Sequence, residues 1–399
     1  MGNTPNVRFK GFTEDWEQRK LGDVAQEFKS GNSLKADKID ITGDYPVYGG
    51  NGLRGYTSTY NHDGEYALIG RQGALCGNMN YSVGKAYFTE HAVVVKADAN
   101  NDTRFLYYML DTMNLGQYSD QSAQPGLAVN KLVKLENRFP IKEEQQRIGW
   151  YFNNLDHLIT LHQQKCDETK EFKKYMLQNM FPQKDEKVPK IRFDGFTGDW
   201  EQRKLSEISD FITKGATPTT YGYDWQESGI PFFRNDAIKD NKFSYGDFSY
   251  ISEEANEALQ RSEIHGDDIL VAITGDIGKA GIVPKSIEKG NINQHTARVR
   301  IIKDAIPYFV YQSLITDKQQ KKYQLIKTGL SMPQLSLQQI RDTIILCPSV
   351  EEQSMIGECF INLDNLITLH QQKCNALKEF KKYMLQNMFP QKGENKCQN

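Results

Sequence analysis

Two long stretches of this chain place apolar or small residues three or four positions apart, the spacing of a helix with one apolar face. The first stripe consists of Ile148, Phe152, Leu155, Ile159, His162, Cys166, Thr169, Phe172, Met176 and Met180. The second consists of Ile356, Phe360, Leu363, Ile367, His370, Cys374, Leu377, Phe380, Met384 and Met388. Pro182 and Pro390 end the two helices. The pattern predicts two helices of roughly 40 residues, each about 60 Å long.

A helix of that length with a single apolar stripe needs a partner to cover the stripe. The similar second helix is the obvious partner, in a two-stranded coiled coil. If a pseudo-twofold axis crosses the helices, they run antiparallel. The alternative is two independent helices, each packed on its own domain.

The segments 22–140 and 206–348 have a different pattern, with many Gly, Asn and Tyr residues between short apolar runs. The runs at 66–69, 91–95, 268–272 and 297–301 are typical of strands between turns. Residues 105–110 and 307–314 are typical of two equivalent short helices. We therefore expect two mixed α+β domains that share a fold, although their sequences differ.

The chain also repeats itself. Residues 7–21 return with few changes as 191–205, and residues 170–184 return unchanged as 378–392. The segments between these blocks barely resemble each other. The predicted organisation is a first variable domain, a first helix, a second variable domain, a second helix and a tail, over residues 1–140, 141–184, 185–348, 349–392 and 393–399. The repeated blocks and the two dissimilar segments suggest one protein framework that carries two domains with different recognition properties.

Composition is that of an ordinary globular protein, with a net charge of −2 and a mean hydropathy of −0.63. This charge weakens any hypothesis of strong non-specific DNA binding, although a basic face can be offset by an acidic one. No apolar run is long enough to span a membrane, and the N-terminus lacks the features of a signal peptide. We expect a cytoplasmic protein with reduced cysteines.

Motifs for catalysis are missing. The chain has no P-loop, no GxSxG, no HExxH and no Asn/Asp-Pro-Pro-aromatic motif. The cysteines and histidines do not have the spacing of a zinc site. The glycine-rich loop 69–77 parallels 273–281, and His91 parallels His295; we interpret the loops as tight turns. The sequence therefore predicts no catalytic residue, no metal and no cofactor in this chain.

Polar and aromatic residues are plentiful in the predicted loops. Arg, Asn and Gln make paired hydrogen bonds to base edges, and Lys and Arg neutralise phosphates. Such residues also occupy ordinary surface loops. The candidates for DNA contacts are Asn51, Arg54, Tyr56, Arg71, Gln72, Asn78, Tyr223, Arg234, Asn235, Lys279, Asn293 and Gln294.

The long helices offer a second kind of candidate. Their polar positions match between the two copies, although a packed core would retain only the apolar ones. Recent duplication or recombination within the repeats would have the same effect. The candidates for binding a partner at both helices are Lys170, Lys173, Lys174, Gln178, Lys378, Lys381, Lys382 and Gln386.

Three repeated motifs carry a resemblance to a known family. They are 140–148 with 348–356, where domain meets helix; 154–160 with 362–368, within the helices; and 16–21 with 200–205, where each variable domain opens. In this order the chain resembles the specificity subunit of a type I restriction–modification system over nearly its whole length.

The resemblance implies a non-catalytic subunit whose two target-recognition domains each read one half of a split site in double-stranded DNA. It implies that the helices set the spacing between the halves and bind two modification subunits, which carry S-adenosylmethionine and methylate adenine. Restriction subunits, with nuclease and translocase activity, would join that core. Two alternatives are a tandem protein-binding scaffold with no DNA role and a self-sufficient restriction enzyme. The bases read and the spacer length do not follow from the sequence.

Overall fold

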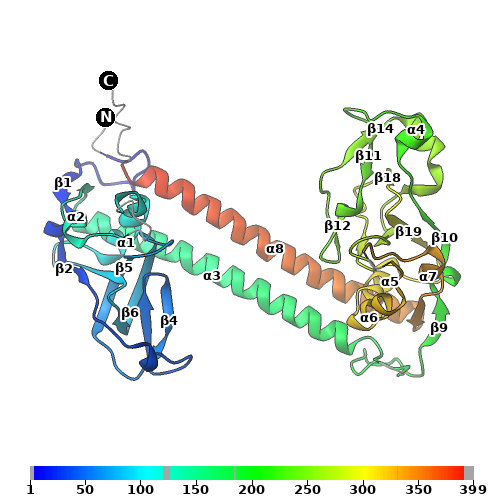
Figure 1. Cartoon of the computed structure of the whole chain (residues 1–399), viewed down its shortest axis with the longest axis horizontal. Helices are drawn as coiled ribbons and strands as arrows, with labels where there is room; N and C mark the ends of the chain where they lie inside the picture. The colour runs from blue at the N-terminus through cyan, green and yellow to red at the C-terminus, as the bar shows by residue number, and fades with distance from the viewer. Residues whose placement is uncertain (1–3, 120–125, 184–185, 330, 391–399) are drawn as a thin grey trace. The chain divides into compact units, whose positions relative to one another are not determined.

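The computed structural model describes residues 4–119, 126–183, 186–329 and 331–390. The predicted tail at 393–399 lies outside this range. Contacts divide the chain into two compact units, Met1–Gln164 with Gln371–Asn399 (unit 1) and Lys165–His370 (unit 2) (Figure 1). Because the boundaries fall inside the long helices, each unit contains one variable domain and a part of both helices.

The two predicted long helices are present. Helix α3 spans Lys142–Asn179, with 38 residues, and α8 spans Val350–Met388, with 39 residues. The C-terminal residues of α8 pack in unit 1, and those of α3 pack in unit 2. None of the helices in the described part of the chain is both long and apolar enough to cross a membrane.

The helices pair antiparallel in unit 1. The Phe152 and Phe389 rings lie 5.9 Å apart, and the Lys381 ammonium lies 2.6 Å from the Asp156 carboxylate. Farther along α3, the Cys374 thiol donates to the carbonyl of Ile159 at 3.9 Å. Residue numbers rise along α3 while those of its neighbours fall along α8, which is the antiparallel order.

Unit 2 has the same pairing with the helices exchanged. The Phe181 and Phe360 rings lie 6.0 Å apart, and the Lys173 ammonium lies 2.7 Å from the Asp364 carboxylate. The Cys166 thiol donates to the carbonyl of Ile367 at 3.8 Å. The predicted coiled coil is therefore confirmed in each unit, against two separately packed helices.

One position of the predicted stripe is wrong in both helices. Phe172 and Phe380 are 51% and 46% exposed, whereas the neighbouring Lys173 and Lys381 lie between the helices. The interior stripe continues from Cys166 to Met176 through a lysine rather than an aromatic ring. A lysine is tolerated there because a carboxylate of the facing helix pairs with it.

Unit 1 contains a six-stranded sheet in the order β2-β7-β5-β6-β3-β4. Neighbouring strands are antiparallel except β3 and β6, which are parallel. The strands are β2 Ala25–Ser30, β3 Tyr45–Gly49, β4 Gly52–Thr57, β5 His62–Gly70, β6 Met79–Phe88 and β7 Ala92–Ala97. Helices α1 (Thr103–Thr112) and α2 (Val129–Leu132) follow the sheet. The predicted strands and short helix are confirmed.

Unit 2 contains two four-stranded sheets, in the orders β10-β19-β16-β17 and β14-β11-β18-β15. The first consists of β10 Ser209–Lys214, β16 Ile269–Ala272, β17 Ala280–Ile282 and β19 Thr296–Ile301. The second consists of β11 Ile230–Phe233, β14 Ser249–Ile251, β15 Glu263–Ile264 and β18 Gly290–Ile292. The hairpin β12 Ile238–Lys239 with β13 Lys242–Phe243 and the helices α4 Glu253–Ala258, α5 Pro307–Leu314, α6 Asp317–Ile326 and α7 Leu337–Arg341 complete the domain.

The central strands of both domains are buried on both faces. In β16, Ile269 and Val271 join the core that contains α5, while Leu270 and Ala272 join a second core. In β5, Ala67 and Ile69 face α1, and Leu68 faces away into a smaller core. Because successive side chains point to opposite faces, a continuous apolar run fits this position.

The short repeated block forms a ribbon beside each helix junction. Strand β1 (Glu17–Lys20) pairs with β8 (Glu136–Phe139), and β9 (Glu201–Lys204) pairs with β20 (Ile344–Cys347). The preceding tryptophans are buried at equivalent places, with Trp16 6.3 Å from Phe389 and Trp200 6.1 Å from Phe181. Each copy of the block thus packs where one of the repeated long helices ends.

Candidate nucleic-acid interface

Three loops meet at one end of the sheet in unit 1. They are the β3–β4 turn, the β5–β6 loop and the turn before β7. A Cβ on Gly70 would lie 2.3 Å from the Gly50 carbonyl, and one on Gly50 would lie 3.0 Å from the His91 carbonyl. The loops therefore touch through their backbones, and only glycine fits at Gly70.

Several predicted DNA contacts lie on this loop cluster. The Arg54 side chain covers Gly49, where a Cβ would meet its Cδ at 2.5 Å, and Asn51 is exposed in the same turn. The Arg71 guanidinium donates to the Glu90 carbonyl at 3.5 Å, and Gln72 Oε1 lies 3.0 Å from His91 Nδ1. The structure thus brings Asn51, Arg54, Arg71 and Gln72 together.

Of the other two candidates of unit 1, Asn78 belongs to the β5–β6 loop of this cluster, and Tyr56 does not. Asn78 is exposed just before β6, and its carbonyl accepts from Gly70 N at 2.7 Å. Tyr56 is half-buried at the far end of the β3–β4 hairpin, where its backbone pairs with Asp40. Tyr56 therefore lies away from the loop cluster.

Unit 2 has a corresponding cluster of different composition. The Asn235 amide donates to the Thr274 carbonyl at 3.0 Å, which ties the loop after β11 to the loop after β16. Exposed Gln294 accepts a hydrogen bond from the Thr217 hydroxyl at 2.7 Å. Lys279 is half-buried, and its carbonyl accepts from Ala272 N.

Arg234 belongs to a separate aromatic corner. Its guanidinium donates to the Ser249 hydroxyl at 3.0 Å and lies 5.5 Å from the centre of the Trp225 ring. Both residues are exposed, and half-buried Tyr223 packs against the small core below them. The guanidinium of an arginine beside an aromatic ring is suited to meeting another planar group.

Asn293 is a structural residue rather than an exposed reader. It is 9% exposed, and its side-chain oxygen accepts from the His295 amide and the Thr296 hydroxyl, both at 3.2 Å. These bonds hold the turn before β19. This geometry gives Asn293 a structural role, and its contact with DNA stays a prediction.

The backbone defines which loop positions correspond between the units. Arg71 N donates to the His91 carbonyl at 2.9 Å, and Ile273 N donates to the His295 carbonyl at 3.0 Å. The predicted match of His91 with His295 is therefore confirmed. The predicted match of the glycine-rich loops is displaced by two residues, because Arg71 corresponds to Ile273.

The helix junctions use the same residues in both units. Arg8 pairs with Glu144 at 2.7 Å, and Arg192 pairs with Glu352 at 2.7 Å. Both carboxylates are buried. Sequence reasoning missed these pairs, although each arginine and each glutamate recurs in its repeated block.

Glutamine side chains complete each junction. Gln145 Oε1 accepts from Asp102 N at 3.0 Å, and Gln353 Oε1 accepts from Ile306 N at 3.0 Å. Each thereby binds the backbone at the start of the short helix α1 or α5. A Cβ on Gly149 would lie 2.9 Å from Asp102 Oδ1, so α1 approaches α3 very closely.

The partner-binding candidates divide into two groups. Lys173 and Lys381 are held by Asp364 and Asp156, so their ammonium groups are paired inside the protein, and their contact with a partner stays a prediction. The remainder lie at the surface: Lys170, Lys174, Gln178, Lys378, Lys382 and Gln386. Gln178 donates to Asp317 at 3.3 Å. Phe172, Tyr175, Phe380 and Tyr383 are exposed on the same helices and were not predicted as surface residues.

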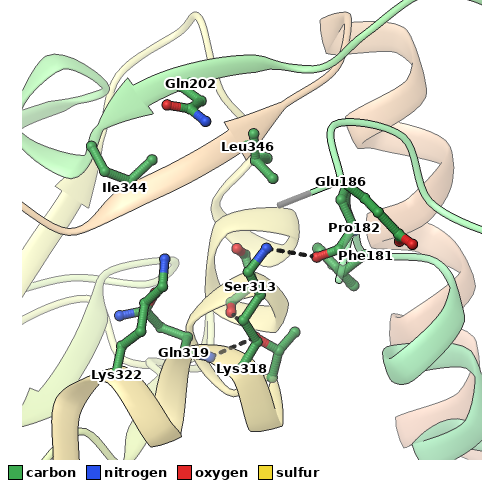
Figure 2. Close-up of a pocket in the computed structure, with 11 residues that line it drawn as sticks. Phe181, Pro182, Glu186, Gln202, Ser313, Lys318, Gln319, Lys322, Ile344 and Leu346 are labelled. Atoms are coloured by element: carbon green, nitrogen blue, oxygen red, sulfur yellow. Dashed lines mark hydrogen bonds between the residues drawn. The ribbon is translucent and has the colours of Figure 1, made fainter. Parts of the chain in front are cut away.

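Small cavities adjoin the ends of the long helices. One of about 200 Å³ lies between Pro182 and the segment from α5 to α6, where Lys318 donates to the Pro182 carbonyl at 3.0 Å (Figure 2). Another of about 210 Å³ includes Pro390 and the residues after α1. Within the described residues, no group of His, Cys, Asp or Glu is arranged to hold a metal ion.

Comparison with known proteins adds a family to this geometry. A family model described as the type I restriction modification DNA specificity domain matches residues 13–171 and 197–379. The two matches together include most of the chain.

Individual proteins that are similar to this chain are also type I specificity subunits. The EcoprrI specificity subunit of Escherichia coli is 42% identical over 156 residues, which is 38% of this chain and 39% of that protein's length. A putative MjaX specificity subunit of Methanocaldococcus jannaschii is 22% identical over 93% of this chain and 92% of its own. The crystal structure of a type I restriction–modification S subunit from M. genitalium matches with a TM-score of 0.72 at 17% identity, over 98% of this chain and 100% of that one.

Proposed function

Because this chain belongs to the type I restriction–modification DNA specificity family, we propose that its two variable domains each read one half of a split DNA site. The observation that carries the proposal is the contrast at equivalent loop positions. Arg71 and Gln72 in one domain correspond to Ile273 and Thr274 in the other, on the same backbone hydrogen bonds. Two domains that share a loop backbone but carry different side chains are suited to recognising two different DNA sequences.

We further propose that the chain positions DNA without chemistry of its own. Methyl transfer would be supplied by two modification subunits that bring S-adenosylmethionine, and restriction subunits would join them. The exposed aromatic and lysine side chains recur on both helices, and this supports docking of two copies of one partner. A rigid helix pair would set the spacer between the half-sites.

Methylation-sensitive sequencing of host DNA, with and without this gene, tests the proposal. A two-part motif methylated only when the gene is present is the expected result. Exchange of residues 24–139 for those of another family member should then change one half of the motif. An unchanged methylation pattern in the deletion strain would contradict the proposal, and methyl transfer by the purified chain alone would contradict its non-catalytic role.

The competing function, a tandem protein-binding scaffold, predicts a different result in the same experiment. Deletion would leave the DNA methylation unchanged, and DNA of any sequence would fail to bind the chain with its modification subunits. Gel retardation with matched and scrambled DNA distinguishes the two functions directly.

A further inference from the structure

A carboxylate lies at the meeting point of three helices in each unit. In unit 2, Asp364 on α8 accepts from the Lys173 ammonium of α3 at 2.7 and 2.9 Å and from the Tyr308 hydroxyl of α5 at 2.7 Å. In unit 1, Asp156 on α3 accepts from Lys381 of α8 at 2.6 and 2.8 Å and from Tyr108 of α1 at 2.7 Å. Each carboxylate therefore joins both long helices to one recognition domain.

The two tyrosines reach their carboxylates from different positions. Phe105 and Phe309 mark equivalent positions, because they lie 5.8 and 5.7 Å from Trp16 and Trp200. Tyr308 directly precedes Phe309, whereas Tyr108 follows Phe105 by nearly one helical turn. The residue of α5 that corresponds to Tyr108 is Gln312, whose amide also lies 3.5 Å from Asp364.

The different positions of the two tyrosines indicate that the hydrogen bond matters in itself, and is not simply a copy of one ancestral residue. A hydroxyl inherited from a common ancestor would sit at one position in both domains. Here the domains have diverged, yet each places a tyrosine hydroxyl on the same carboxylate. The same hydrogen bond is therefore present in both domains, although residues at different positions of the short helix make it.

The surroundings of Asp364 strengthen its hydrogen bonds. The Lys173 and Asp364 side chains are 10% and 16% exposed, so water competes weakly for the carboxylate. Burial lowers the pKa of the Lys173 ammonium, although Asp364 opposes that shift. The Lys242 ammonium of the recognition domain lies 3.8 Å from Asp364 and adds a second positive charge beside the carboxylate. The unit 1 carboxylate is more open, at 37% exposed.

We infer that Asp156 and Asp364 are orientation locks, each of which holds a recognition domain at one rotation on the long helices through a tyrosine hydroxyl. Tyr108, Tyr308, Lys173 and Lys381 are the positioning residues of these locks. The inference rests on the proposed function, because a fixed rotation matters only if the loops must meet two half-sites at a set angle. A domain that can rotate would accept half-sites at other spacings.

The test uses the full chain assembled with its modification subunits. Methylation rates are measured on DNA with the natural spacer and with spacers one base pair shorter and longer. Tyr308→Phe keeps the ring and removes the hydroxyl. We expect the preference for the natural spacer to fall about tenfold, which corresponds to about 1.4 kcal/mol. The bases read in each half-site should stay the same.

Tyr323→Phe is the matched control. Tyr323 is fully buried, and its hydroxyl lies 3.1 Å from the Thr343 hydroxyl inside the same domain, where it does not meet the long helices. It should lower the melting temperature without changing the spacer preference. Tyr108→Phe repeats the test in unit 1 if Tyr308→Phe does not fold, with a smaller effect expected at the more open carboxylate.

The spacer preferences of the two variants decide whether the lock exists. A tenfold loss of spacer preference in Tyr308→Phe with none in Tyr323→Phe supports the lock. An unchanged preference in a folded Tyr308→Phe protein, or an equal loss in both variants, overturns it. If the unaltered chain directs no methylation with its partners, the proposed function itself fails, and the lock is overturned with it.

Discussion

The side chains of the recognition loops differ between the two units of this chain, whereas those of the helix junctions are the same. At the loops, equivalent backbone positions carry an arginine in one unit and a buried isoleucine in the other, Arg71 and Ile273. At the junctions, the same ion pair occurs twice, with Arg8 on Glu144 and Arg192 on Glu352. The loops vary in side chains on a shared backbone, and the junctions keep their side chains.

This contrast shows what exchange of a recognition domain requires. Exchange of residues 24–139 keeps the arginine and tryptophan of the short block, so the new segment needs a backbone amide for the junction glutamine and a hydroxyl for the helix carboxylate. The tyrosine position shows that such a contact can be met from another place on the helix. The loops carry no such requirement, so they are free to change what they read.

The largest expected effect comes from breaking a junction. Arg192→Met leaves the Glu352 carboxylate, whose side chain is 1% exposed, without its cation. Loss of one partner of a buried pair costs about 3–5 kcal/mol. Arg8→Met should cost a similar amount in unit 1. Thermal unfolding measures both variants.

Arg19→Met is the control for the junction variants. Arg19 pairs with Glu17 on the exposed ribbon, where the two side chains are 42% and 70% exposed. An exposed pair contributes about 0–1 kcal/mol, so this variant should unfold near the temperature of the unaltered chain. Equal losses in Arg192→Met and Arg19→Met would refute the importance of burial at the junction.

A recognition-loop variant should change reading without changing stability. Arg71→Ala removes a half-exposed guanidinium whose hydrogen bond to the Glu90 carbonyl is long, at 3.5 Å. If Arg71 reads a base, discrimination at one position of one half-site should fall by about 1–3 kcal/mol. Methylation rates on single-base variants of the site measure this, with Gln294→Ala as a change at an exposed loop residue of the other domain. A loss spread evenly over both half-sites would contradict base reading by Arg71.

Repeats and periodicity predicted the architecture well, because helix packing leaves a period in the sequence. The three- or four-residue spacing located both long helices, and the apolar runs located the central strands. The predicted stripe is wrong at Phe172. Residue spacing alone allows either Phe172 or Lys173 to face the other helix. Only the facing residue, Asp364, decides which side chain turns inward.

The candidate site was predicted less completely. Asn51, Arg54, Arg71 and Gln72 came together as loop residues, because they flank turns whose glycines forced close contact. Tyr56 and Asn293 were of the right chemical type, but Tyr56 lies at the far end of its hairpin and the Asn293 side chain is turned inward. Composition does not give the direction of a side chain. The tyrosines that bond to Asp156 and Asp364 stand at different positions in the two halves of the sequence. Comparison of the halves therefore could not reveal these hydrogen bonds.

The orientation locks also predict a modest change in alkaline stability. Burial, followed by the charge of Asp364, raises the pKa of Tyr308 above its ordinary value of 10.0. The folded state then holds a proton that the unfolded state releases, so this contribution is complete below pH 10 and is lost as the pH rises through the folded pKa. Each pH unit above 10 costs up to about 1.4 kcal/mol per such tyrosine.

Tyr308→Phe should therefore lose stability less steeply than the unaltered chain between pH 10 and pH 11. Denaturant midpoints at several pH values measure the two slopes. Tyr108→Phe should behave alike, since burial and the bond to Asp156 raise the pKa of Tyr108 too. Parallel slopes for the variant and the unaltered chain would show that the hydroxyl does not hold its proton more tightly in the folded state.

The smallest expected effect concerns the surface of the helices. Lys174 and Lys382 are exposed and equivalent, and each lies near the exposed aromatic pair of its repeat, Phe172 with Tyr175 or Phe380 with Tyr383. Surface substitutions change folding stability by about 0.5 kcal/mol or less. Lys174→Glu and Lys382→Glu should therefore leave unfolding unchanged but slow the association with modification subunits, most clearly at low salt. If two identical partners dock, the two variants should slow association to the same extent, and the double variant should slow it further. Lys303→Glu, an exposed change in the variable domain of unit 2, is the control. Equal slowing by Lys303→Glu would mean that overall charge, rather than the repeated helix surface, guides the partner.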